Sequence, residues 1–206
     1  MTSAVILGDV GDTLPTLAGA GFAAIYADPP WSYRTWSAKG SGRSAEQHYN
    51  VMSTNDICAL PVSSVAADDA VLFMWTTWPT IRDAFRVIEA WGFEYKTCAF
   101  DWLKADVSTI DLFPDPKTAD MNLGHWTRSN GEACLLATRG KPKRQDAGVR
   151  MGIIEPARGH SRKPYCVYQR IERLVAGPYL EIFARNAKSG WTALGNQVGK
   201  FAETAS

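Results

Sequence analysis

Eight short apolar runs divide the chain, and segments with helical spacing lie between several of them. Short apolar runs bounded by turn residues predict buried strands. These runs are Val5–Leu7, Ala23–Ala27, Ala70–Trp75, Tyr95–Trp102, Ala133–Thr138, Gly152–Glu155, Tyr179–Phe183 and Thr192–Leu194. Alternating strands and helices are typical of an α/β fold with a largely parallel sheet. No repeat or linker interrupts the pattern, so we expect a single domain over residues 1–206.

Helices are predicted where apolar residues recur at helical spacing between start and stop signals. One begins at a cap, Thr77, and ends at Gly92. Another follows Pro164 and ends before Gly177. A shorter helix is expected after Ser53.

Two long segments, 34–49 and 104–130, show neither kind of spacing. Long irregular segments in a compact domain are usually functional lids or linkers. Ligands of doubly wound sheets bind outside the carboxyl ends of the strands. We therefore expect both segments to be loops that close over one site. Residues 200–206 are predicted to form a flexible tail.

Composition narrows the class of protein. The 206 residues are 46% hydrophobic and 21% charged, which fits a globular domain with a real core. No run is long and apolar enough to span a membrane, and the first residues lack the features of a signal peptide, so a cytoplasmic protein is expected. The four cysteines and three histidines are scattered, without the spacing of a metal site.

The formal net charge is only +1, so any contact with nucleic acid needs a local basic patch. Residues 139–163 contain eight basic and two acidic residues, a local excess of six positive charges. Within this run Lys143, Arg144 and Arg150 are candidate phosphate contacts. The alternative is a solvated loop, which is the commoner fate of a charge run and the better interpretation of this run alone.

The letters YADPPW place an acid, Asp28, directly after an apolar strand and before a rigid turn. Pro29 and Pro30 donate no backbone N–H, so the Asp28 carboxylate and the Pro29 carbonyl can both face outward as acceptors. The exocyclic amine of a nucleobase has two N–H donors, which this pair matches. Trp31 or Tyr33 would then offer a face for the base to stack on. The alternative is a capping Asp before a turn, with the tryptophan in the core.

A set of ordered motifs resembles the MT-A70-like family of adenine-N6 methyltransferases. In chain order they are LGDVGD, DPPW, LFMW, GHWTRSNGEACLLATRGKP, HSRKP, and LEIFAR followed by GWTALGNQ. Cytosine-N4 methyltransferases use motifs similar to DPPW, but the ordered set is specific. The resemblance implies a Rossmann-like class I methyltransferase fold, permuted so that the catalytic motif is N-terminal. Its central sheet would be mostly parallel, with helices on both faces.

The resemblance also implies S-adenosylmethionine as cofactor and assigns roles to residues. The catalytic motif would be Asp28, Pro29, Pro30 and Trp31. Cofactor contacts would come from Asp9, Val10, Asp28, Lys163, Arg185, Asn186, Asn196 and Gln197. Lys163 would pair with the methionine carboxylate. Tyr49 would lie at the substrate entrance, and Trp126 and Glu132 would shape the adenine pocket.

The implied reaction is methyl transfer to the N6 amine of adenine in nucleic acid. Compact family members are typical of bacteria and phages, where DNA is the usual substrate, so DNA is expected. The alternatives are an RNA adenine-N6 methyltransferase, a DNA cytosine-N4 methyltransferase, and a non-catalytic subunit that binds nucleic acid. Degenerate subunits lose motifs that this chain retains. The sequence does not distinguish a monomer from a homodimer.

Overall fold

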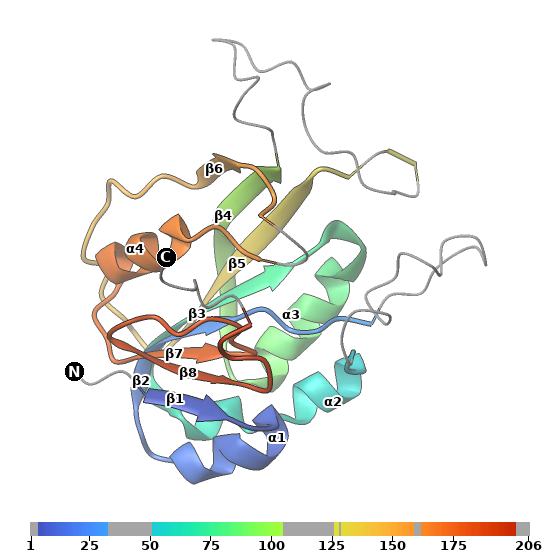
Figure 1. Cartoon of the computed structure of the whole chain (residues 1–206). Coiled ribbons are helices and arrows are strands. Elements are labelled where there is room, and N and C mark those ends of the chain that lie inside the picture. Colours follow the sequence, from blue (N-terminus) through green and yellow to red (C-terminus); the bar gives the residue numbers. More distant parts are fainter. Residues whose placement is uncertain (1–3, 33–50, 105–125, 128, 159–161, 201–206) are drawn as a thin grey trace, which may run out of the picture.

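One mixed sheet organises the chain (Figure 1). The structure, a computed structural model, describes residues 4–32, 51–104, 126–127, 129–158 and 162–200. In these residues eight strands form a sheet in the order β1-β8-β7-β2-β3-β5-β4-β6. The strands are β1 (Ala4–Leu7), β2 (Phe22–Ala27), β3 (Ala66–Thr76), β4 (Glu94–Lys104), β5 (Gly131–Arg139), β6 (Gly152–Glu155), β7 (Tyr179–Ile182) and β8 (Trp191–Gly195). Each predicted strand is confirmed.

The sheet is mostly parallel, with one strand reversed. Strands β1, β8, β7, β2 and β3 pair in parallel, as do β4 and β6. Strand β5 is antiparallel to both of its neighbours, β3 and β4. Because β5 is reversed, its first residues lie at the edge where the other strands end. Gly131 and Glu132 therefore lie at the same edge as the residues that follow β2 and the residues that end β4.

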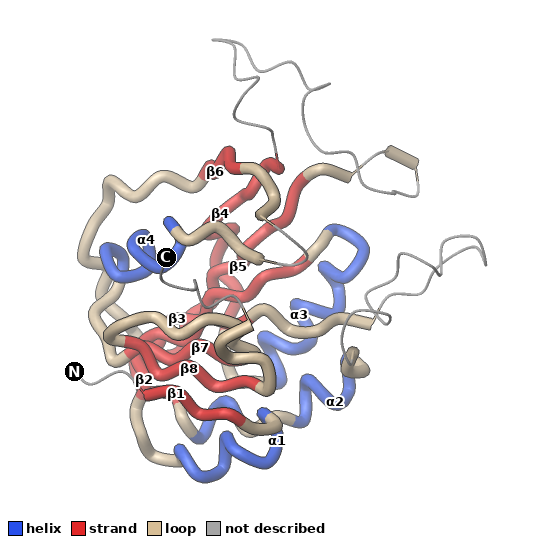
Figure 2. Tube along the Cα trace, in the orientation of Figure 1, coloured by secondary structure: helices blue, strands red, loops and turns tan. Residues whose placement is uncertain are grey.

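Four α-helices occur in the described residues (Figure 2): α1 (Val10–Thr13), α2 (Thr54–Ala59), α3 (Ile81–Ala90) and α4 (Cys166–Leu174). Helices α2, α3 and α4 confirm the three predicted helices. The one-turn α1 was not predicted. Asp9 caps it, because its carboxylate accepts hydrogen bonds from the backbone N–H of Gly11 at 2.8 Å and of Asp12 at 3.4 Å.

Helices cover both faces of the sheet, and the alternation of side chains along β2 shows why. Ile25 and Ala27 pack in a cluster with apolar residues of α1, α2 and α3. Ala24 and Tyr26 point the other way, into a second cluster with α4. A strand buried on both faces must be apolar throughout, as β2 is. None of the helices in the described part of the chain has the length and apolarity needed to cross a membrane.

The backbone segments at the ends of β7 and β8 are in close contact. Phe183, just after β7, has a φ of 65°, a left-handed conformation that costs a non-glycine residue about 1–3 kcal/mol. The next residue, Ala184, donates its backbone N–H to the Leu194 carbonyl at 2.9 Å. A Cβ on Gly195 would lie 2.5 Å from the Ala184 carbonyl oxygen. Gly195 therefore permits the segments after β7 and β8 to lie against each other.

We predict that Gly195→Ala lowers the free energy of unfolding by about 1–3 kcal/mol, because the added methyl group must displace backbone. Urea denaturation followed by circular dichroism measures the change. Gly152→Ala in β6 is the matched control, since a Cβ there meets nothing within 4 Å. Equal stability of the two variants would contradict the close approach.

Candidate active site

Several predicted site residues lie along one edge of the sheet, each just beyond the end of a parallel strand. Asp28 follows β2, Arg185 and Asn186 follow β7, and Asn196 follows β8. Asp9 follows β1, and the backbone N–H of Gly8 donates to the Gly195 carbonyl at 3.4 Å. This edge is the usual position for ligands in sheets of this kind.

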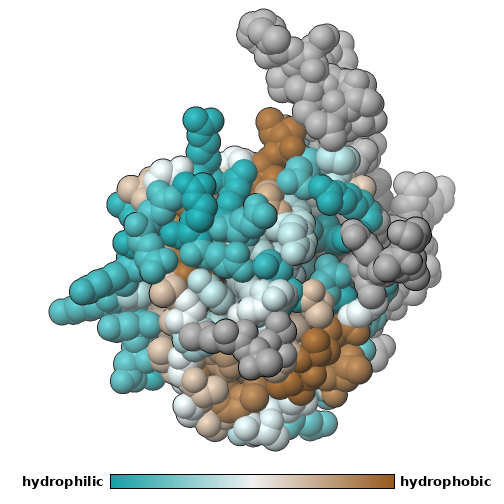
Figure 3. Space-filling view, turned by 60° about the vertical axis from the view of Figure 1, so that its left-hand side comes forward, coloured by the Kyte–Doolittle hydropathy of each residue, from teal (hydrophilic) through white to brown (hydrophobic). Residues whose placement is uncertain are grey.

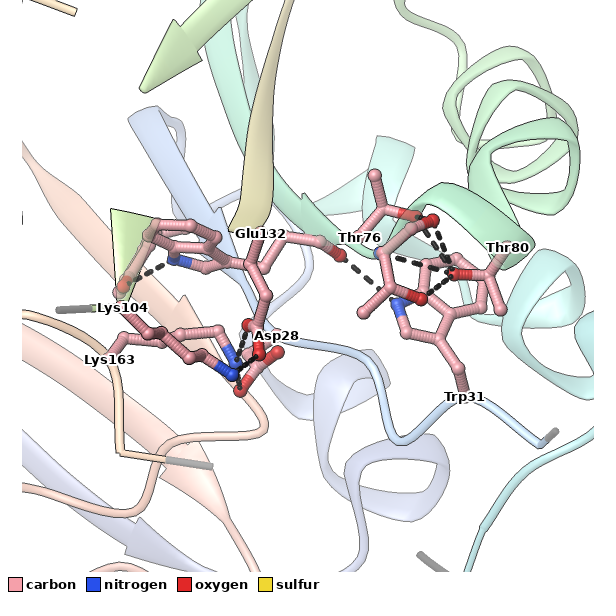
Figure 4. Close-up of polar contacts among 10 residues, drawn as sticks. Asp28, Trp31, Thr76, Thr80, Lys104, Glu132 and Lys163 are labelled. Carbon is pink, nitrogen blue, oxygen red and sulfur yellow. Dashed lines mark hydrogen bonds and ion pairs between the residues drawn. The ribbon is translucent and has the colours of Figure 1, made fainter. Parts of the chain in front are cut away.

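Four charged side chains meet at this edge (Figure 4). Lys163 Nζ lies 2.7 Å from Asp28 Oδ2 and 3.2 Å from Glu132 Oε2. Lys104 Nζ forms an ion pair with the other oxygen of Glu132, Oε1. The charges alternate in sign, so Glu132 and Lys163 each contact two opposite charges. Asp28, Glu132, Lys104 and Lys163, called here the charge cluster, come from four segments that are distant in sequence.

The charge cluster is largely shielded from water. Exposed fractions of the side chains are 11% for Lys163, 15% for Glu132 and 19% for Asp28. Burial alone would favour the neutral forms. For Glu132, burial is outweighed by Lys163 and Lys104, which lower its pKa to about 2. For Lys163, burial is outweighed by Asp28 and Glu132, which raise its pKa. Both groups are therefore charged at neutral pH.

A small pocket lies beside the charge cluster and includes two of its members, Asp28 and Lys163. Arg185 and Asn186, both expected at the cofactor site, also line it. The structure thus brings together four expected site residues from three segments that are far apart in the sequence. The other lining residues are Tyr26, Tyr168, Glu181 and Phe183. The pocket combines acids, cations and aromatic rings in a small space.

Glu181 and Tyr168 are pocket residues that the sequence analysis missed. Glu181, on β7, is 8% exposed, and its Oε2 accepts a hydrogen bond from the Tyr168 hydroxyl at 2.7 Å. Burial is the main cause that raises the pKa of Glu181 to about 8. The signal in the sequence that could have identified Glu181 is the presence of an acid in an otherwise apolar strand. Its neighbour Tyr26 accepts a 2.7 Å hydrogen bond from the Trp75 indole N–H.

The expectation that Trp31 offers a stacking face is wrong for this structure. Its side chain is only 5% exposed, and its indole N–H donates to the Trp75 carbonyl at 3.1 Å. Figure 4 shows it directed towards Thr76 and Thr80, away from the charge cluster. The Pro29 carbonyl accepts the backbone N–H of Trp31 at 2.8 Å, which leaves one lone pair for another donor. Trp31 therefore anchors the turn that presents Asp28.

The sequence matches the MT-A70 family over residues 22–197, which is most of the chain and includes both the charge cluster and the pocket. The chain belongs to the MT-A70 family of adenine-N6 methyltransferases. It is 33% identical to the type II methyltransferase M.MunI of Mycoplasma sp, over 91% of this chain and 82% of that protein. It is 31% identical to the N(6)-adenosine-methyltransferase MT-A70-like protein of Drosophila melanogaster, over 86% of this chain and 27% of that protein.

Human METTL3, the catalytic subunit of an N(6)-adenosine-methyltransferase, is 30% identical over 86% of this chain and 28% of its own length. The MT-A70 chain thus spans about four fifths of the Mycoplasma protein and about a quarter of the two animal proteins.

Other expected cofactor residues lie further along the same edge of the MT-A70 sheet. Asp9 is committed to capping α1, and Val10 is 6% exposed and packs in the core. Asn196 is exposed and Gln197 is half-buried, and both directly follow β8. Their contacts with a cofactor remain predictions.

Some expected substrate residues lie outside the described residues. These are Tyr33 and Tyr49, with the segment 34–49, most of the segment 104–130, and all but the first residue of the tail 200–206. Trp126 is described and is 93% exposed. Its expected place in the adenine pocket remains a prediction.

Two members of the basic run, Lys143 and Arg144, lie away from the charge cluster. Lys143 and Arg144 follow the last residue of the reversed strand β5, so they lie towards the edge opposite Glu132. Both are exposed, and the next residue, Gln145, donates its backbone N–H to the Leu174 carbonyl at the end of α4. Arg150 is also exposed. Figure 3, which brings the α4 side forward, shows hydrophilic side chains over much of that face. Lys163, at the end of the run, belongs to the charge cluster.

We predict that the stabilising effect of Glu132 disappears in acid. Its pKa is about 2 in the folded protein against an ordinary 4.5, so it contributes about 3 kcal/mol above pH 4.5 that is lost as pH falls towards 2. Unfolding free energies of wild type and Glu132→Gln, measured at several pH values, should differ most near neutrality and converge in that range. A difference that stays constant with pH would contradict the ion pairs with Lys104 and Lys163.

Proposed function

We propose that this MT-A70 protein transfers a methyl group from S-adenosylmethionine to the N6 amine of adenine in DNA. The observation that carries the proposal is the position of Asp28, which follows β2, lines the pocket and contacts Lys163. A single methyltransferase domain over residues 1–206 with a permuted class I fold is part of the proposal. The DPPW motif follows β2, whereas the expected cofactor residues Arg185 and Asn196 follow the last two strands. A cytoplasmic location remains a prediction.

The donor set of the pocket fits the expected cofactor. A zwitterionic amino-acid tail needs a cation for its carboxylate and an acid for its amine. Lys163 supplies the cation and Asp28 supplies the acid, while Arg185 and Asn186 supply further polar groups. Bound S-adenosylmethionine would supply an electrophilic methyl group. In this proposal Lys163 holds its carboxylate, and Asp9 and Val10 border its adenine. Arg185 and Asn186 approach its ribose, and Asn196 and Gln197 contact the ribose or the adenine edge.

The chain's contribution to the reaction is to hold the adenine amine. The amine is a poor nucleophile, because its lone pair is delocalised into the ring. If its two N–H groups donate to the Asp28 carboxylate and the Pro29 carbonyl, the nitrogen becomes pyramidal and its lone pair is directed outward. Orientation of this kind can lower a barrier by about 7–11 kcal/mol. The Asp28 carboxylate also stabilises the positive charge that develops on the nitrogen.

Rigidity of Asp28 matters for this role, and the structure provides it. Lys163 holds one carboxylate oxygen from one side. On the other side, Trp31 ties the DPPW turn to β3 through the Trp75 carbonyl. Both contacts are shielded from water. Asp28 is thereby preorganised, so little rearrangement is needed when a base arrives.

Two observations favour DNA methylation over the alternatives. This chain covers 82% of the type II methyltransferase M.MunI. It covers only about a quarter of the two N(6)-adenosine-methyltransferases from animals. The intact charge cluster also argues against a non-catalytic subunit. If the substrate is duplex, the adenine must be flipped out of the stack to reach Asp28.

Methylation of defined oligonucleotides tests the function. Purified protein and S-adenosylmethionine are incubated with single-stranded DNA, duplex DNA and RNA, and the nucleosides are identified by mass spectrometry. We expect N6-methyladenine in DNA. Methylation of RNA without methylation of single-stranded or duplex DNA would support an RNA adenine-N6 methyltransferase. Formation of N4-methylcytosine would support a DNA cytosine-N4 methyltransferase.

We predict that Asp28→Ala lowers the single-turnover rate by about a hundredfold or more, because a preorganised contact with the amine is lost. Fold and cofactor binding should persist, as shown by circular dichroism and calorimetry. Glu89→Ala is the control, because Glu89 is an exposed acid in the last turn of α3 and belongs to neither the charge cluster nor the pocket. A folded Asp28→Ala protein that methylates at the wild-type rate would refute the proposed role of DPPW.

The position of the basic run leads to a separate prediction about DNA length. Lys143 and Arg144 can reach phosphates only if the duplex extends well beyond the target base. The double change Lys143→Ala and Arg144→Ala should weaken binding to a long duplex and reduce its salt dependence. Methylation of a short oligonucleotide should be unchanged. If binding of the long duplex at low salt is also unchanged, the run is a solvated loop.

A further inference from the structure

Glu181 is a buried acid that the amine-holding mechanism does not use. It lies on β7 opposite Tyr26 of β2. The Tyr168 hydroxyl of α4 donates to its Oε2 at 2.7 Å. Glu181 lines the same pocket as Asp28. An apolar residue would satisfy the packing of this strand without the penalty of burying a carboxyl group, so the acid calls for a ligand-directed explanation.

The pocket around Glu181 has the composition of a site for a cation. Two acids, Asp28 and Glu181, line it together with three aromatic side chains, Tyr26, Tyr168 and Phe183. Carboxylates attract positive charge directly, and aromatic faces attract it through their quadrupole. Cations of the protein, Lys163 and Arg185, also line the pocket, and Lys163 is engaged by Asp28 and Glu132.

The charged and titratable groups that face Glu181 come from each neighbouring element. Burial is the largest effect and raises the pKa of Glu181, and the negative charge of Asp28 raises it further. The Tyr168 hydrogen bond and the positive charge of Arg185 lower it, and the resulting pKa is about 8. Tyr26 stays neutral, because its own pKa is raised well above the ordinary value by burial. Lys163 is positively charged at neutral pH. At pH 7, Glu181 is therefore mostly protonated in the ligand-free protein.

We propose that Glu181 senses the positive charge of the cofactor: it ionises when a sulfonium enters the pocket, and thereby favours S-adenosylmethionine over S-adenosylhomocysteine. The inference rests on the proposed function. The two ligands share the adenosine and the amino-acid tail and differ in the methyl group and the charge on sulfur. A carboxyl group that is neutral in the free protein gives no attraction until a cation makes its ionisation favourable.

The sign of the pH dependence follows from linkage. A bound cation lowers the pKa of Glu181, so binding releases a proton. Affinity for the cationic ligand therefore rises with pH up to about 8, by up to about tenfold per pH unit, and levels off above it, where Glu181 is already ionised. A ligand with neutral sulfur lacks this contribution. Discrimination against the spent cofactor is thus expected to be stronger at pH 8 than at pH 6.

Calorimetry tests the inference without any methyl transfer. Affinities for S-adenosylmethionine, S-adenosylhomocysteine and the cationic analogue sinefungin are measured from pH 6 to pH 9, in buffers with different ionisation enthalpies to count released protons. We expect wild type to release more protons with the two ligands that carry the extra charge. Glu181→Gln should abolish that excess and reduce the affinity ratio at pH 8 at least tenfold. Subtracting the variant from wild type removes the titration of the ligands' own amino groups.

Glu172→Gln is the matched control. Glu172 is a half-buried acid on α4 that accepts the Trp191 indole N–H at 2.8 Å and does not line the pocket. It should leave the affinities and the proton counts unchanged. A second variant, Tyr168→Phe, keeps the carboxyl group but removes the hydrogen bond that lowers its pKa. The pH at which affinity levels off should then move upward, and this variant tests the inference even if Glu181→Gln fails to fold.

The outcomes separate the inference from the proposed function. If both cofactor forms bind wild type with the same pH dependence and the same proton release, the charge-sensing role is overturned and the methyltransferase proposal stands. If Glu181→Gln retains the wild-type excess of released protons, the charge-sensing role is likewise overturned. If neither cofactor form nor sinefungin binds at any pH, the proposed function itself fails.

Discussion

The contact of Lys163 with Asp28 and Glu132 is the constraint on which the site depends. A lysine with 11% of its side chain exposed is stable as a cation only if its surroundings are anionic. Removing one partner of a buried ion pair typically costs about 3–5 kcal/mol, because the other charge is left uncompensated. The fold must therefore deliver both acids to the same point. It does so with Asp28 at the end of β2 and Glu132 at the start of β5.

The reversal of β5 follows from the same requirement. In a fully parallel sheet the first residues of this strand would lie at the opposite edge, remote from Asp28. The antiparallel pairing of β5 with β3 and β4 instead places Glu132 between two lysines. The left-handed Phe183 and the close contact of Ala184 with Gly195 shape the other half of the edge. The ion pairs of the charge cluster and the left-handed residue Phe183 thus lie at the same edge of the sheet.

The sequence predicted the strands well because each is a short apolar run, and runs buried on both faces are hard to mistake. It missed α1, since a single turn has no periodicity. The cap of this helix, Asp9, was instead interpreted as a cofactor contact. It misplaced Trp31, because the letters DPPW do not say which way an indole points. The basic run was ambiguous, because charge density does not identify an edge of the sheet. Glu181 was visible as an acid in an apolar strand, but its partner Tyr168 is 13 residues away.

The pairing of β4 with β5 has an evolutionary consequence. The backbone N–H of Lys104 donates to the Asn130 carbonyl at 2.9 Å, so the two ends of the segment 105–130 are held one strand spacing apart. Closing a longer or shorter segment between fixed ends changes the free energy only slowly with length. A change in the length of this segment during evolution is therefore expected to cost little stability, and it would leave the strands that carry Lys104 and Glu132 in place.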